Sequence, residues 1–129
     1  MPVKLPDTWE PTKFIECTEG RWSANRNYLP AQSWFVAECQ APVYSSFIKR
    51  YCDGDIIDLG CGTVPFYSLY AKQAETVLCV DWPNTGHSSL HVDKFVDLNS
   101  SFSFEQQFDT AICLDVLEHL LYPREFLSN

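Results

Sequence analysis

The spacing of apolar residues changes near residue 52, which divides the chain into residues 1–52 and 53–129. Residues 1–30 show no sustained period, so the sequence predicts an irregular arm with one short helical turn at most. Over residues 31–51 apolar side chains recur at spacings near three and four, which predicts an amphipathic helix with a kink or break at Pro42. Its expected apolar face consists of Trp34, Phe35, Cys39, Val43, Phe47 and Tyr51.

Residues 53–129 alternate short apolar runs with turns and helical stretches. The runs at 56–59, 76–81, 94–96 and 110–114 predict four strands, and helices are expected over 65–74 and after residue 115. Strands that alternate with helices are joined by right-handed crossovers and form a parallel sheet, so the predicted class is α/β. Ligands bind such sheets beyond the carboxyl ends of the strands, and the informative polar residues fall there.

Composition narrows the picture to one folded domain over residues 1–129. The chain is 46% hydrophobic, and its nine Phe, six Tyr and four Trp supply core material. A net charge of -8 argues against non-specific binding to nucleic acid or to an anionic membrane surface. No apolar run approaches the roughly 20 residues of a membrane span, so no membrane insertion is expected.

The six cysteines raise the question of the cellular compartment. The N-terminus lacks the apolar core of a signal peptide, so we expect a cytoplasmic protein with reduced thiols. The cysteines form no C-x-x-C pair and no Cys/His grouping of the zinc-finger type, so no metal site is expected. Cys79 and Cys113 lie in apolar runs and are expected to be small buried side chains.

The first candidate site is the segment DIIDLGCGTV, in which a predicted strand runs into a loop with Gly60, Cys61 and Gly62. Glycine allows positive φ and a close approach of the backbone to a ligand. A dinucleotide fingerprint, G-x-G-x-x-G, would require glycine where this chain has Pro65. Asp58 beside the loop would repel a pyrophosphate but suits a ligand with a positive amino group. A tight turn that serves packing alone is the alternative.

Two further acids end the next predicted strands. Asp81 follows Gly60 by 21 residues, where a carboxylate can accept hydrogen bonds from both ribose hydroxyls of nicotinamide and adenosyl cofactors alike. Asp97 ends the third predicted strand, where its carboxylate could accept a hydrogen bond from an adenine amino group while the Leu98 backbone supports the ring edge. A solvated turn acid is the alternative for Asp97.

These motifs resemble those of the class I, Rossmann-like S-adenosylmethionine-dependent methyltransferases (type 11-like) over residues 55–123. The resemblance implies a Rossmann-like sheet and S-adenosylmethionine as the cofactor. It implies that the glycine loop lines the methionine end and that Asp81, with its neighbour Trp82, holds the ribose. The segment FDTAICLDVLEHLLYP looks like the family's motif after the fourth strand, with Asp115 and Val116 beside the adenosyl group and the sulfonium. Where the family has another glycine, this chain has Val64.

The combination of CGTVPFY, CVDWPNTGH and DLN is similar to a branch of this family often associated with bacterial surface-polysaccharide biosynthesis. The expected acceptor is a sugar or another small molecule that the sequence does not identify. Methyl transfer from a sulfonium is an in-line displacement, so the protein mainly aligns donor and acceptor and removes a proton from a hydroxyl acceptor. His119 is the candidate general base and His87 a second candidate, because histidine titrates near neutrality. A packing role at a helix start is the alternative for His119.

Two other functions fit part of the pattern. One is a catalytically silent S-adenosylmethionine-binding scaffold that needs a partner. The other is an NAD-dependent oxidoreductase, favoured by Asp81 and opposed by Asp58 and Pro65. The family's fold would continue after Asn129 with a helix, a fifth strand and an antiparallel hairpin, so we expect an incomplete sheet of about four strands. We therefore expect either a fragment of a longer enzyme or a unit that self-associates through the exposed edge of its sheet.

Overall fold

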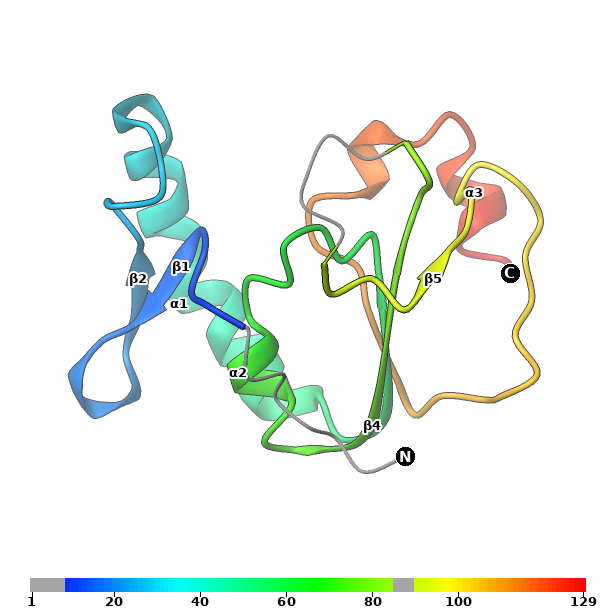
Figure 1. The fold of residues 1–129 in the computed structure, drawn as a ribbon, viewed down its shortest axis with the longest axis horizontal. Coiled ribbons are helices and arrows are strands. Elements are labelled where there is room, and N and C mark those ends of the chain that lie inside the picture. The colour runs from blue at the N-terminus through cyan, green and yellow to red at the C-terminus, as the bar shows by residue number, and fades with distance from the viewer. Residues whose placement is uncertain (1–8, 85–89) are drawn as a thin grey trace.

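A four-stranded parallel sheet forms the centre of residues 53–129 in the computed structural model, which describes residues 9–84 and 90–129 (Figure 1). Its strands are β3 (Gly54–Leu59), β4 (Ala74–Asp81), β5 (Lys94–Phe95) and β6 (Thr110–Ile112). They lie in the order β5-β4-β3-β6, and each neighbouring pair is parallel. The predicted α/β class and all four predicted strands are therefore confirmed, although β6 is shorter than its apolar run.

The sheet is covered on both faces, which explains why its strands appear in the sequence as continuous apolar runs. Successive side chains of a strand point to opposite faces. Ile56 accordingly packs in one buried cluster with residues of the N-terminal part, and Ile57 and Leu59 pack in a second cluster with Phe126. The fold thus has three layers, with the sheet in the middle.

The N-terminal arm forms a small antiparallel ribbon, so the prediction of an irregular segment was wrong there. Strands β1 (Phe14–Glu16) and β2 (Trp22–Ala24) pair with each other, and a 3₁₀ turn at Thr18–Gly20 lies between them. Each strand has only three residues, which is too short to show a period in the sequence. Phe14 and Trp22 are almost fully buried in the first cluster, so contacts with the rest of the molecule stabilise the ribbon.

Helix α1 (Trp34–Tyr51) follows a 3₁₀ turn at Ala31–Ser33. It continues through Pro42, so of the predicted kink or break the break does not occur. Its predicted apolar face was wrong as well. Phe35 is 79% exposed, and four further members of that predicted face are exposed: Cys39, Val43, Phe47 and Tyr51.

The buried face of α1 is made mainly of small side chains. Ala37, Ala41 and Ser45 are buried together with Ile48. Small side chains allow the helix backbone to approach β2 and the segment Tyr67–Tyr70 closely. The size of the side chains, more than their hydrophobicity, therefore decides which face is buried here.

The connections between strands contain less helix than predicted. Helix α2 (Tyr67–Tyr70) is a single turn between β3 and β4, and within the described residues no helix joins β4 to β5 or β5 to β6. After β6 the chain forms a 3₁₀ turn at Leu117–His119 and the short helix α3 (Pro123–Phe126). None of the helices in the described ranges has both the length and the apolar character needed to cross a membrane.

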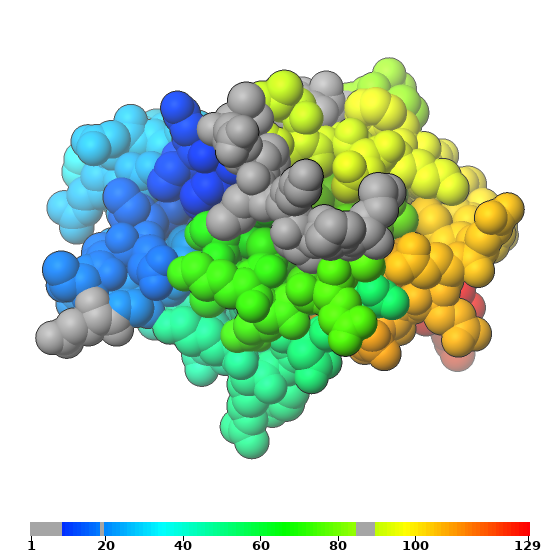
Figure 2. Space-filling view, turned by 60° about the horizontal axis from the view of Figure 1, so that its bottom comes forward, coloured from blue at the N-terminus to red at the C-terminus, as the bar shows by residue number. Residues whose placement is uncertain are grey.

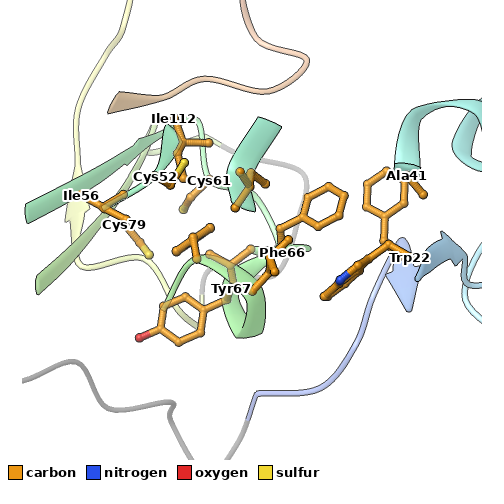
Figure 3. Close-up of a cluster of buried hydrophobic side chains, with 14 of the residues drawn as sticks. Trp22, Ala41, Cys52, Ile56, Cys61, Phe66, Tyr67, Cys79 and Ile112 are labelled. Atoms are coloured by element: carbon orange, nitrogen blue, oxygen red, sulfur yellow. The ribbon is translucent and has the colours of Figure 1, made fainter. Parts of the chain in front are cut away.

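Phe66, just before α2, lies at the junction of the N-terminal part and the sheet layer. Its ring stacks on Phe14 with centroids 4.5 Å apart and lies 5.1 Å from the ring of Trp22. Figure 3 shows Phe66 between Trp22 on one side and the sheet residues Ile56 and Cys79 on the other. One buried cluster therefore joins the described residues of the N-terminal part, 9–52, to the sheet layer. Cys79 is buried as predicted, and Cys113 is half-buried.

Candidate functional site

The chain reverses its direction across the sheet between β3 and β6. Strands β4 and β5 extend the sheet to one side of β3, and β6 returns to the other side. Such a switch point leaves a crevice at the carboxyl ends of the two strands, because the loops that follow them diverge. A cavity of about 470 Å³ opens there. Every site residue predicted from the sequence, apart from His87, lines it: Asp58, Gly60, Cys61, Gly62, Asp81, Trp82, Asp97, Leu98, Asp115, Val116 and His119.

The glycine loop after β3 follows a path that requires glycine at its first position. Gly60 has a φ of +73°, and a Cβ atom there would overlap the side chain of Val116, which follows β6. The amides of Gly60 and Cys61 both donate to the carbonyl of Val80, at 2.8 and 3.0 Å. The loop is thus held to β4 while it passes close to the segment after β6.

Val64 adopts a backbone conformation that favours glycine. Its φ is +48°, although β-branched residues rarely occupy this region. The side chain is fully buried, and the Val64 amide donates to the carbonyl of Cys61 at 2.8 Å. The valine that replaces the glycine expected from the resemblance therefore retains a left-handed backbone, and burial of its side chain offsets the strain.

Asp58 is a buried acid at the floor of the cavity. It is 5% exposed, and its Oδ2 accepts a hydrogen bond of 2.8 Å from the Tyr70 hydroxyl. Burial raises the pKa of Asp58 to about 7; the negative charge of Asp81 adds to this rise and the Tyr70 hydrogen bond opposes it. A ligand cation at this position would stabilise the ionised carboxylate.

Asp81 ends β4 with both carboxylate oxygens bound to backbone amides. Oδ2 accepts from the Gly62 amide at 3.0 Å and Oδ1 from the Trp82 amide at 2.9 Å. The side chain is 7% exposed. Each carboxylate oxygen can accept a second hydrogen bond, so the group has the capacity to bind a diol while it stays oriented by the backbone. The neighbouring Trp82 is about half exposed at the cavity wall.

Asp97 lines the cavity and also stabilises its own turn. Its Oδ1 accepts a hydrogen bond of 2.9 Å from the Asn99 amide, and its carbonyl accepts one from the Ser100 amide at 3.1 Å. The side chain is exposed, whereas its neighbour Leu98 is buried in the second cluster. Asp97 therefore stabilises a turn, as one of its two predicted roles required, and it also lines the cavity.

The segment after β6 places Asp115 against helix α1. Asp115 has a φ of +55°, and its Oδ1 accepts from the hydroxyl of Tyr44 at 2.7 Å and from Nε2 of Gln40 at 3.4 Å. Burial, followed by the hydrogen bond to Asp115, raises the pKa of Tyr44 to about 12. Further along, the exposed His119 lies at the cavity and donates its backbone amide to the carbonyl of Val116 at 2.9 Å.

Several residues that line the cavity were not predicted from the sequence. Lys13, Phe14 and Tyr44 come from the N-terminal part, and no local signal connects them with a site more than a dozen residues away. Phe66 and Tyr70 also line the cavity, and their four-residue spacing after the glycine loop could have indicated a shared face. Candidate base His87 lies outside the described residues.

The charge of the cavity is predominantly negative. Four carboxylates line it, those of Asp58, Asp81, Asp97 and Asp115. Among the described residues, Lys13 is the one Lys or Arg side chain in the lining. Such a cavity favours a ligand with positive groups and disfavours a pyrophosphate.

The chain was compared with family models, with curated proteins and with solved structures. No match was found in any of the three comparisons.

Proposed function

We propose that this protein is a class I S-adenosylmethionine-dependent methyltransferase with a Rossmann-like sheet, and that the cofactor binds in the cavity between β3 and β6. The observation that carries the proposal is the meeting of a left-handed glycine loop and four carboxylates at the switch point of a parallel sheet. S-adenosylmethionine carries an ammonium and a sulfonium, so an acidic cavity suits it better than it suits NAD.

The proposed contacts follow the order of the strands. Asp58 would bind the ammonium, because it is a buried acid beside a loop that permits close approach. Asp81 would bind the ribose hydroxyls with the lone pairs that its backbone partners leave free. Asp97 and Leu98 would bind the adenine, and Asp115 with Val116 would lie beside the adenosyl group and the sulfonium.

The chemistry asks little of the protein beyond alignment. S-adenosylmethionine, when bound, supplies an electrophilic methyl group. Acidic walls stabilise its positive charge, and the exposed rim around His119 leaves room for a sugar or another small acceptor. His119 would accept the proton of an acceptor hydroxyl as the methyl group is transferred. We further propose a cytoplasmic location, in which the six cysteines stay free thiols as they are here.

Calorimetric titration with S-adenosylhomocysteine and, separately, with NAD tests the cofactor assignment. We expect S-adenosylhomocysteine to bind and NAD to show no heat of binding. Asp58→Asn and Asp81→Asn should each weaken S-adenosylhomocysteine by about tenfold or more, since each removes a charged hydrogen-bond partner. Glu75→Gln, an exposed acid at the amino end of β4, is the control and should bind as the unmodified protein does. NAD binding without S-adenosylhomocysteine binding would overturn the proposal.

A labelled methyl donor separates an enzyme from a silent scaffold. Incubation with candidate sugars and other small acceptors should give a labelled product, and His119→Gln should slow its formation at saturating donor. Cofactor binding with no transfer to any acceptor would favour the scaffold.

The edge of β6 is expected to support self-association. Among the described residues β6 pairs with β3 alone, so its other side offers unpaired backbone groups. Light scattering should then show a mass that rises with protein concentration, and a constant monomer mass would contradict edge pairing.

A further inference from the structure

The N-terminal arm is attached directly to the glycine loop. The indole Nε1 of Trp9 donates to the carbonyl of Val64 at 3.1 Å, and the hydroxyls of Thr12 and Thr63 share a hydrogen bond of 2.9 Å. These partners are more than 50 residues apart in the sequence. In Figure 2 the N-terminal segment (blue) adjoins the segment that follows the glycine loop (green). The arm is thus part of the wall of the cavity.

Lys13 lies between two such anchors. Thr12 precedes it, and Phe14, which stacks on Phe66, follows it. The carbonyl of Lys13 accepts a hydrogen bond of 2.9 Å from the Asn25 amide. The backbone at Lys13 and both of its neighbours are therefore held, and the half-buried Lys13 lines the cavity.

The ammonium of Lys13 has no charged partner within the described part of the chain, although four carboxylates line the same cavity. The ion pair in the described part of the chain joins Lys72 to Glu16, and neither of these residues lines the cavity. A lysine that merely neutralised the acidic wall would be expected to pair with one of those carboxylates. A lysine that lines the cavity without a charged partner in the described residues is instead suited to an anionic group of a ligand.

We propose that Lys13 binds the carboxylate of the amino-acid end of the ligand. Asp58 beside the glycine loop would take the ammonium of the same end, so the two side chains together would recognise a zwitterion. This inference rests on the proposed function, and it extends the site to a residue of the N-terminal arm. It predicts that the arm selects adenosyl ligands that carry an amino-acid end over those that lack one.

Two thioethers separate this role from a general effect of charge. S-adenosylhomocysteine has the amino-acid end, whereas methylthioadenosine has the same adenosine and sulfur without it. Both would be titrated calorimetrically into the full chain, into Lys13→Gln and into Lys13→Arg. Lys72→Gln, which removes a lysine charge away from the cavity, is the matched control. Thermal unfolding of each variant checks that it is folded.

We expect Lys13→Gln to weaken S-adenosylhomocysteine by about tenfold or more, because a charge-assisted hydrogen bond is lost. Methylthioadenosine should bind Lys13→Gln as it binds the unmodified protein. Lys13→Arg should restore most of the affinity, and Lys72→Gln should change neither ligand.

Other outcomes overturn the inference in distinguishable ways. An unchanged affinity of Lys13→Gln for S-adenosylhomocysteine, or an equal loss for both thioethers, would refute the role of Lys13 and leave the proposed function standing. Failure of the unmodified chain to bind S-adenosylhomocysteine at all would refute both.

Discussion

The two sides of the cavity are built differently. On the side of β3 and β4, Asp58 and Asp81 are almost fully buried, and a tyrosine hydroxyl and two backbone amides hold their carboxylates. On the side of β5 and β6, Asp97, Asp115 and His119 are exposed. Their contacts run within their own turns or to helix α1.

This difference separates a preformed subsite from an adaptable one. The first side belongs to the core, so its polar groups keep their positions whether or not a ligand is bound, and substitutions there should affect folding as well as binding. The second side lies on loops at the surface, where acceptor-binding groups are commonly found. Substitutions there should affect binding with little effect on stability.

The largest effect is expected at Gly60. Gly60→Ala places a Cβ atom against Val116 and forces alanine into a positive φ, so the free energy of unfolding should fall by about 4 kcal/mol. Urea denaturation measures the change. Gly20→Ala is the matched control, because Gly20 has a similar φ of +71° but a Cβ atom there would meet nothing closer than the Lys49 amine, at 3.7 Å. The control should lose only about 1 kcal/mol. Equal losses would show that Val116 does not restrict the loop.

A smaller, pH-dependent effect is expected at Asp58. Its pKa is raised from 3.8 to about 7 in the folded protein, so the folded state binds the proton more tightly than the unfolded state does. The contribution of Asp58 to stability is therefore fully present below about pH 4 and is lost as the pH rises to about 7, with a slope of about 1 kcal/mol per pH unit. Asp58→Asn should abolish this slope in denaturation curves measured from pH 4 to 8.

Tyr70→Phe provides the opposite test of the Asp58 environment. The Tyr70 hydrogen bond lowers the pKa of Asp58, so its removal should extend the pH-dependent loss of stability to higher pH. If the stability of Asp58→Asn still fell as the pH rose, a group other than Asp58 would bind the proton that folding takes up.

The smallest of the three effects is expected at Asp81, compared with Asp97. Asp81→Asn turns one carboxylate oxygen into an amide donor that faces a backbone amide. The free energy of unfolding should therefore fall by about 2 kcal/mol. Asp97→Asn keeps an oxygen that can accept from the Asn99 amide, and no measurable change in stability is expected. Thermal and urea unfolding of both variants test the pair. A similar loss in each would mean that the two sides of the cavity do not differ as described.

The sequence predicted the side of the cavity formed by strand ends much better than it predicted the N-terminal part. Residues that end buried parallel strands must meet at one edge of the sheet, so Asp58, Asp81, Asp97 and Asp115 could be grouped from their positions along the chain. Helix α1 lies where it was predicted, but its predicted apolar face was wrong because hydrophobicity marked Phe35 and Phe47 as buried. The helix instead packs through Ala37 and Ala41, which allow closer approach.

The sequence alone determined the parallel sheet, the glycine loop and the acids at the strand ends, because each follows from local patterns and from the geometry common to such sheets. Only the tertiary structure decided that a ribbon of two three-residue strands places Lys13, just before β1, at the cavity and that Tyr44 contacts Asp115. The reason is physical: both contacts depend on how segments distant in the chain pack, and no local propensity encodes that packing.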